Sequence, residues 1–159
     1  MVPTASERHR RLLPVVVAAT VVLADQLTKW WALEALAGGR VINLVWTLRL
    51  NLTSNTGFAF SLGGGFGPLI AVVVIAVIGV LVWHGRTISS RTGAVAVGLL
   101  LGGALSNLGD RAFRGDGFLS GAVVDFIDLQ WWPIFNLADA AVVIGVALFL
   151  VSSLRAAEP

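Results

Sequence analysis

Four apolar stretches constrain the fold of this chain more than any other feature of its sequence. They cover about 12–35, 66–83, 93–108 and 133–154. A helix needs roughly 20 mostly apolar residues to cross the hydrocarbon core of a membrane. Only 13% of the residues are charged, whereas soluble domains carry about a quarter. We therefore predict an all-α membrane protein, a single domain over 1–159 with four transmembrane helices.

Basic residues near the ends of these stretches predict the orientation, because Lys and Arg favour the cytoplasmic side. The arm before residue 12, the loop 84–91 and the tail after residue 154 all carry arginine. The bias is modest, but most acidic residues fall on the opposite side. We expect a multi-pass membrane protein with both termini in the cytoplasm and with outer loops 36–65 and 109–132. Four tryptophans suit the outer aromatic belt: Trp30, Trp31, Trp131 and Trp132.

The first stretch also has features of a cleaved signal peptide. It has a basic start, an apolar run and a candidate cleavage site at Ala35, Leu36 and Ala37. We favour an uncleaved span, because the polar residues from Asp25 to Lys29 would lie awkwardly before such a site. Sequencing of the mature N-terminus distinguishes the two.

The two outer loops have different patterns. Thr47, Arg49 and Asn51 alternate with leucines, which indicates a half-buried strand. The loop 109–132 mixes glycine, charged and aromatic residues, so we expect it to lie along the membrane surface. No basic block is long enough for a nucleic-acid surface.

Polar residues gather in five segments near the outer ends of the spans, where ionisable groups are costly and indicate function. In the first segment, Asp25 and Lys29 are four residues apart and can pair on one helix face. A structural ion pair explains them at least as well as catalysis. The second segment contains Asn55 and Gly57, which also fit an ordinary turn after a strand.

The third segment begins with small residues at a spacing of four, Gly98, Gly102 and Ser106, which allow two helices to approach closely. It ends in polar residues that packing alone does not require: Asn107, Asp110 and Arg111.

The fourth and fifth segments hold the most informative carboxyls. Apolar neighbours should raise the pKa of Asp125, whereas Asp128 fits a surface acid better. Asn136 and Asp139 are three residues apart and share a helix face. A wholly apolar helix follows Asp139, so this residue is better explained by function than by chance exposure.

The remaining residue types limit the chemistry. The chain has no cysteine, both histidines are predicted on the cytoplasmic side, and the single lysine has Asp25 as its best partner. Two carboxyls in a poorly solvated site share a proton. The ionised one activates water, and the protonated one polarises an amide carbonyl. From Asp125 and Asp139 we therefore predict hydrolysis without a metal or cofactor. Which of the two is the acid and which the base stays open.

The five segments, in this order, resemble lipoprotein signal peptidase, also called signal peptidase II. The matching stretches are Asp25–Lys29, Asn55–Phe60, Gly102–Arg111, Val123–Phe126 and Phe135–Asp139. One departure is Ser106, where the family usually has glycine.

The resemblance implies a four-helix membrane bundle with a small extracytoplasmic β-cradle from the first outer loop and a surface-lying helix from the second. Asp125 and Asp139 match the catalytic aspartates of an aspartic endopeptidase. The other matching residues shape or support the site: Asp25, Lys29, Asn55, Gly57, Asn107, Asp110, Arg111 and Asn136. The implied substrate is a prolipoprotein cut before its diacylglyceryl-modified cysteine. The implied location is the bacterial plasma membrane, with the site at its outer face, and globomycin is the implied inhibitor.

Three other functions compete with this one. An ion channel or carrier would need polar groups through the depth of the bilayer, whereas here they gather on one side. A metal-dependent lipid transferase would hold Mg²⁺ on the aspartates and would stop in EDTA. An assembly factor without catalysis leaves the buried Asp139 unexplained.

Overall fold

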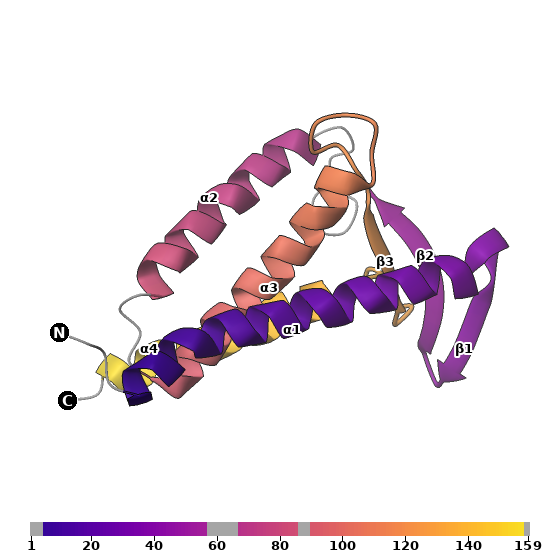
Figure 1. Ribbon diagram of the computed structural model, residues 1–159. Coiled ribbons are helices and arrows are strands. Elements are labelled where there is room, and N and C mark those ends of the chain that lie inside the picture. The colour runs from indigo at the N-terminus through magenta and orange to yellow at the C-terminus, as the bar shows by residue number, and fades with distance from the viewer. Residues whose placement is uncertain (1–4, 57–66, 86–89, 158–159) are drawn as a thin grey trace.

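The computed structural model describes residues 5–56, 67–85 and 90–157. The described chain forms helices, a short 3-10 turn and three strands in the order α1 (Ala5–Ala35), η1 (Ala37–Gly39), β1 (Val41–Val45), β2 (Leu48–Asn55), α2 (Gly67–Gly85), α3 (Arg91–Phe113), β3 (Val123–Asp128) and α4 (Leu137–Ala157). The sheet lies at one end of the helices, and both chain ends lie at the other (Figure 1).

Within the described residues, three helices are long and apolar enough to cross a membrane: Leu12–Ala35, Arg91–Phe113 and Leu137–Arg155. The apolar part of α2 is shorter and covers Pro68–Trp83. Large apolar side chains such as Leu23 and Val143 are exposed on the outside of the helices. An apolar outer surface of this kind is stable in lipid, so the expectation of a membrane protein is confirmed.

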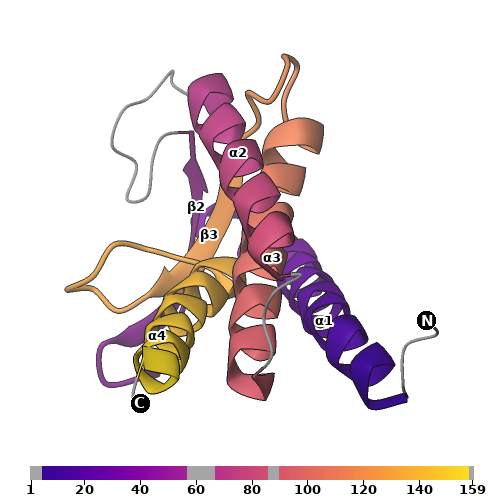
Figure 2. The same ribbon diagram turned by 90° about the vertical axis from the view of Figure 1, so that its left-hand side faces the viewer.

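Helix α3 is central, since it packs against α1, α2 and α4 (Figure 2). A Cβ added at Gly102 would lie 2.7 Å from Cβ of Val21, and one at Gly98 would lie 2.7 Å from Cβ of Val17. On another face of α3, a Cβ at Gly103 would lie 2.5 Å from the carbonyl oxygen of Ala138. The stripe of small residues therefore allows close packing, as the sequence predicts.

The three strands form an antiparallel sheet in the order β1-β2-β3. Strand β2 confirms the strand predicted from the alternation that begins at Thr47. Thr53 of β2 lies opposite Asp125 of β3. A cluster of Ala32, Leu36 and Phe126 packs the sheet against the end of α1. The sheet is what brings the fourth polar segment to the ends of the helices.

The prediction of a surface-lying helix in the second outer loop is wrong. Residues 114–136, all within the described part of the chain, contain no α-helix and instead supply strand β3. One side of this strand pairs with β2, and its other side forms backbone hydrogen bonds with Phe135. Most of its side chains are buried. The loop also begins later than predicted, because α3 continues to Phe113.

We predict that Gly102→Ala destabilises the bundle by about 1–3 kcal/mol, because the added methyl group forces α1 and α3 apart. The measurement is thermal unfolding in detergent micelles. Gly109→Ala is a matched control on the same helix, because nothing lies within 4 Å of a Cβ there. Equal unfolding temperatures for the two variants would contradict close packing at Gly102.

Candidate active site

The start of α4 holds Asp139 in a reciprocal capping arrangement. Oδ1 of Asn136 accepts a hydrogen bond of 2.9 Å from the backbone N–H of Asp139. The backbone N–H of Asn136 donates to Oδ2 of Asp139 at 3.2 Å. This is the capping box, in which the residue before a helix and the third helical residue satisfy each other's N–H groups. The spacing of three residues fixes the Asp139 carboxylate at the positive end of the helix dipole.

The same capping contact orients the amide of Asn136 toward Asp125. Because Oδ1 of Asn136 accepts from the backbone, its Nδ2 is the atom left to donate to Oδ1 of Asp125, at 2.6 Å. Nδ2 of Asn55 donates to Oδ2 of Asp125 at 3.1 Å. Asn136 therefore binds both carboxylates, Asp125 of β3 through its side chain and Asp139 of α4 through its backbone N–H, and brings them into one site.

A buried ammonium orients the second asparagine. Nζ of Lys29 lies 2.7 Å from Asp25 Oδ2, 2.8 Å from Asp110 Oδ2 and 2.9 Å from Asn107 Oδ1. An ammonium group has three protons and no acceptor, so Asn107 must turn its oxygen toward Lys29. Its Nδ2 then donates to Oδ1 of Asp139 at 2.9 Å. Lys29 thus determines which atom of Asn107 faces Asp139.

Asp25 connects α1 to α4 as well as pairing with Lys29. Its Oδ1 accepts from the backbone N–H of Ala138 at 2.9 Å, and Oγ of Ser106 donates to its Oδ2 at 2.7 Å. The predicted ion pair between Asp25 and Lys29 is confirmed. Ser106, the departure from the family pattern, adds a hydrogen bond to this network.

Asp110 connects α3 to β3, much as Asp25 connects α1 to α4. Its Oδ2 accepts from the backbone N–H of Val124 at 3.2 Å, next to Asp125 in the strand. Nε of Arg114 donates to its Oδ1 at 2.8 Å. Arg111 is buried nearby, and its charge interacts with Asp125, Asp110 and Asp139. No motif singled out Arg114, although its position four residues after Asp110 is a signal for an ion pair on one helix face.

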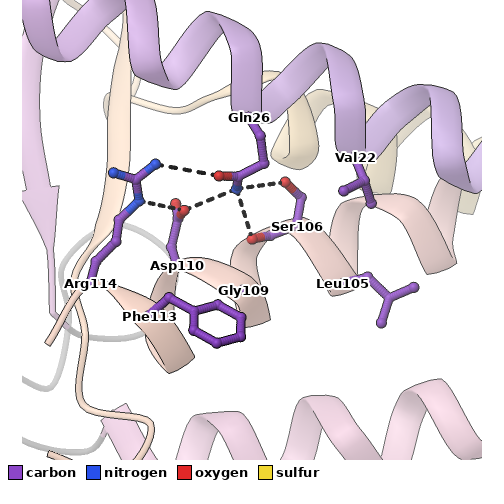
Figure 3. Close-up of a pocket in the computed structure, with 8 residues that line it drawn as sticks. All are labelled: Val22, Gln26, Leu105, Ser106, Gly109, Asp110, Phe113 and Arg114. Atoms are coloured by element: carbon purple, nitrogen blue, oxygen red, sulfur yellow. Dashed lines mark hydrogen bonds and ion pairs between the residues drawn. The ribbon is translucent and has the colours of Figure 1, made fainter.

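A cavity of about 530 Å³ lies between α1 and α3 beside this network. Figure 3 shows Gln26 between Ser106, Asp110 and Arg114 in its wall. Eight residues line the cavity: Val22, Gln26, Leu105, Ser106, Gly109, Asp110, Phe113 and Arg114. Neither Asp125 nor Asp139 is among them, so the cavity is not the place where these two carboxyls meet.

The surroundings of Asp125 change its acidity. Burial raises its pKa to about 6, and the charge of Asp139 adds to the increase. Hydrogen bonds from Asn55 and Asn136 oppose the increase, because they favour the ionised form. Asp125 therefore titrates above the usual range of an aspartate, as its apolar neighbours in the sequence predict.

The interpretation of Asp128 as a surface acid is wrong. The residue is only 3% exposed, and Nε of Arg49 donates to its carboxylate at 2.7 Å. Burial opposes its charge, but hydrogen bonds from Arg49, the backbone of Gln130 and Asn51 outweigh this effect and lower its pKa. Asp128 joins β2 to β3 and takes no part in the contacts of Asp125 and Asp139. Gly57 lies outside the described residues.

Comparison with solved structures defines the class of protein. The fold is similar to that of a bacterial membrane enzyme solved by the in meso method at 2.3 Å resolution. The two share 30% sequence identity and a TM-score of 0.80 over 89% of this chain and 87% of that one. The chain thus has the fold of an integral membrane enzyme.

A family model, signal peptidase (SPase) II, matches residues 17–155. The lipoprotein signal peptidase of Rhodococcus jostii is 42% identical over 99% of this chain and 80% of its own length. That of Mycobacterium avium is 41% identical over 92% of this chain and 81% of its own length. The chain belongs to the signal peptidase II family, and is therefore a protease.

We predict that Lys29→Met destabilises the protein by about 3–5 kcal/mol, because it leaves Asp25 and Asp110 as buried charges without their shared cation. Thermal unfolding in micelles measures the loss. Arg40→Met removes an exposed charge and serves as the control. If both variants unfold at the same temperature, the ion network around Lys29 contributes nothing to stability.

Proposed function

We propose that this protein is an aspartic endopeptidase that removes signal peptides from diacylglyceryl-modified prolipoproteins. It cleaves before the lipidated cysteine at the outer face of the plasma membrane. The observation that carries the proposal is that one residue, Asn136, binds both carboxylates, with its side-chain Nδ2 at Asp125 and its backbone N–H at Asp139. Asp125 is buried and Asp139 is partly buried. Two poorly solvated carboxyls held by one residue share a proton more easily than they both ionise.

The proposed reaction divides acid and base between the two aspartates. Asp139 accepts two hydrogen bonds at the start of α4, where the helix dipole favours a negative charge. It takes a proton from a water molecule, whose oxygen attacks the amide carbonyl. Asp125, with a pKa of about 6, carries the shared proton, polarises the carbonyl and then protonates the leaving nitrogen. No covalent bond to the enzyme forms, and no metal or cofactor is needed.

The proposed topology has four spans with both termini in the cytoplasm. Helix α2 counts as the fourth span, although its apolar part is shorter than the others. The chain ends lie at the end of the bundle opposite the sheet (Figure 1), in agreement with an even number of spans. The sheet and the two aspartates then lie on the outer side. A scissile bond between a lipid anchor and a signal helix stays near this interface, within reach of both carboxyls.

The names of the relatives support the substrate class. The proteins similar to this one over nearly its whole length are lipoprotein signal peptidases. The residues that match the family's motifs also form the contacts around Asp125 and Asp139. We therefore extend prolipoprotein processing, and inhibition by globomycin-type peptides, from the family to this chain.

We predict that Asp125→Asn and Asp139→Asn each lower kcat by roughly 10³-fold or more, since each removes a proton-transfer group. The assay is cleavage of a diacylglyceryl-modified precursor by purified protein, with and without globomycin. Asp128→Asn is the matched control, because it removes a buried carboxylate of the same strand outside the site. Wild-type cleavage by either site variant would contradict the assignment.

The same assay in EDTA separates this function from a metal-dependent one. Cleavage should continue at an unchanged rate, because the proposed acid and base are both side chains. Loss of cleavage that Mg²⁺ restores would favour an enzyme that holds a metal on its aspartates.

We predict that kcat/KM falls as the pH rises through about 6. The reason is that Asp125 loses the proton it must donate above its pKa. Asn55→Ala removes a hydrogen bond that favours the ionised form, so it should raise the pKa of Asp125. The fall in kcat/KM, which is the descending limb of the pH profile, should then move to higher pH. A limb that stays at the same pH in Asn55→Ala would show that Asp125 is not the titrating group.

A further inference from the structure

The turn between β1 and β2 exposes an aromatic side chain on a residue whose backbone conformation is strained. Trp46 has a φ of 52°, in the left-handed region that glycine and asparagine occupy readily. A bulky residue there costs about 1–2 kcal/mol. The same side chain is 93% exposed, so packing within the chain does not repay that cost. A strained residue that is kept without internal contacts points to a role outside the fold.

A second loop presents two more tryptophans beside this turn. Trp131 and Trp132 follow β3, are substantially exposed, and pack edge to face with ring centroids 6.1 Å apart. Nε2 of Gln130 donates to the carbonyl oxygen of Thr47 at 2.8 Å, which ties this loop to the β1–β2 turn. We call the exposed surface of the two loops the tryptophan tip: Leu44, Val45, Trp46, Trp131 and Trp132.

Two hydrogen bonds to the buried Asp128 keep the tryptophan tip in place. Asp128 accepts from Arg49 of β2 at 2.7 Å, and its other oxygen accepts from the backbone N–H of Gln130 at 2.7 Å. These bonds join β2 to the loop that carries Trp131. The rings are therefore presented on a braced end of the sheet, and ordering them on contact with a partner costs little extra entropy.

The chemistry of the tip fits a lipid surface better than a peptide. No charged residue occurs between Val41 and Leu48 or in 129–134, so nothing there attracts a charged partner. Indole rings combine a large apolar face with an N–H donor, which suits the boundary between acyl chains and headgroups. Trp30 and Trp31 are also exposed, near the end of α1 and a few residues before β1 begins.

The position of the tip agrees with this chemistry. Both views show the β1–β2 turn and the connection from β3 to α4 projecting sideways from the helices, on the same side (Figures 1 and 2). When α1, α3 and α4 cross a bilayer, this part of the sheet lies over the lipid beside the bundle. A tip that overhangs the bilayer meets the headgroup region of the outer leaflet.

We propose that the tryptophan tip inserts into the interface of the bilayer that the helices cross. It anchors the sheet, and with it β3, at a fixed depth. The binding partner is the neutral lipid surface itself. This inference does not depend on the catalytic roles of Asp125 and Asp139, so failure of the one is distinguishable from failure of the other.

Because the chain has no cysteine, single labels test the proposal in the full-length protein. Val45→Cys places a bimane label in the tip, and Asp116→Cys places one in an exposed polar loop as a control. Both variants are reconstituted into phosphatidylcholine vesicles with iodide on both sides, or with a nitroxide on the upper acyl chain of the lipid. The nitroxide should quench the label at position 45, and iodide should quench the label at position 116.

A second variant ties the result to the tryptophans. Trp46→Gln, Trp131→Gln and Trp132→Gln combined with Val45→Cys should lose much of the nitroxide quenching and gain iodide quenching. If iodide quenches the original label at position 45 as strongly as the control, the tip lies in water and the proposal is overturned. If neither quencher reaches it, another protein surface, such as a second copy, covers it, and the proposal is again overturned.

Discussion

The buried ammonium of Lys29 is the interaction on which the rest of this structure depends. It is surrounded by Asp25, Asp110 and the oxygen of an asparagine, with all three of its protons used. The two carboxylates extend to backbone N–H groups at the start of α4 and in β3. One cation on α1 thus fixes both elements that carry Asp125 and Asp139. Because each buried charge is costly without its partner, the arrangement forms as a unit.

Backbone and cation, rather than the aspartates themselves, set the geometry of the site. Helix capping orients Asn136, and Lys29 orients Asn107, so each amide has only its nitrogen left for a carboxylate. The donors around Asp125 and Asp139 are therefore in place before any substrate arrives. Polar groups organised in advance in this way need no rearrangement during the reaction, which is an important part of catalysis in poorly solvated sites. The braced tip of the sheet extends the same rigidity to the membrane surface.

Short-range patterns in the sequence predicted much of this architecture. Hydropathy predicted the apolar helices. A spacing of four residues predicted the pair of Asp25 and Lys29, and a spacing of three predicted the pair of Asn136 and Asp139. Contacts between distant segments were not readable. Strand β3 forms because β2 pairs with it, and Asp128 is buried because Arg49 reaches it from 79 residues away. Neither partner is visible in a local window, so Asp128 resembled a solvated acid. The surface-lying helix was expected from the family resemblance, and the local sequence did not indicate strand β3 in its place.

The shared proton of the two aspartates is the central claim, and infrared spectroscopy tests it most directly. The carbonyl stretch of a protonated carboxyl is followed against pH in the reconstituted wild-type protein, with Asp125→Asn as the reference. The account predicts one buried carboxylic acid that loses its proton near pH 6 and is missing in the variant. A band that persists unchanged in Asp125→Asn, or no such band below pH 6, would contradict it.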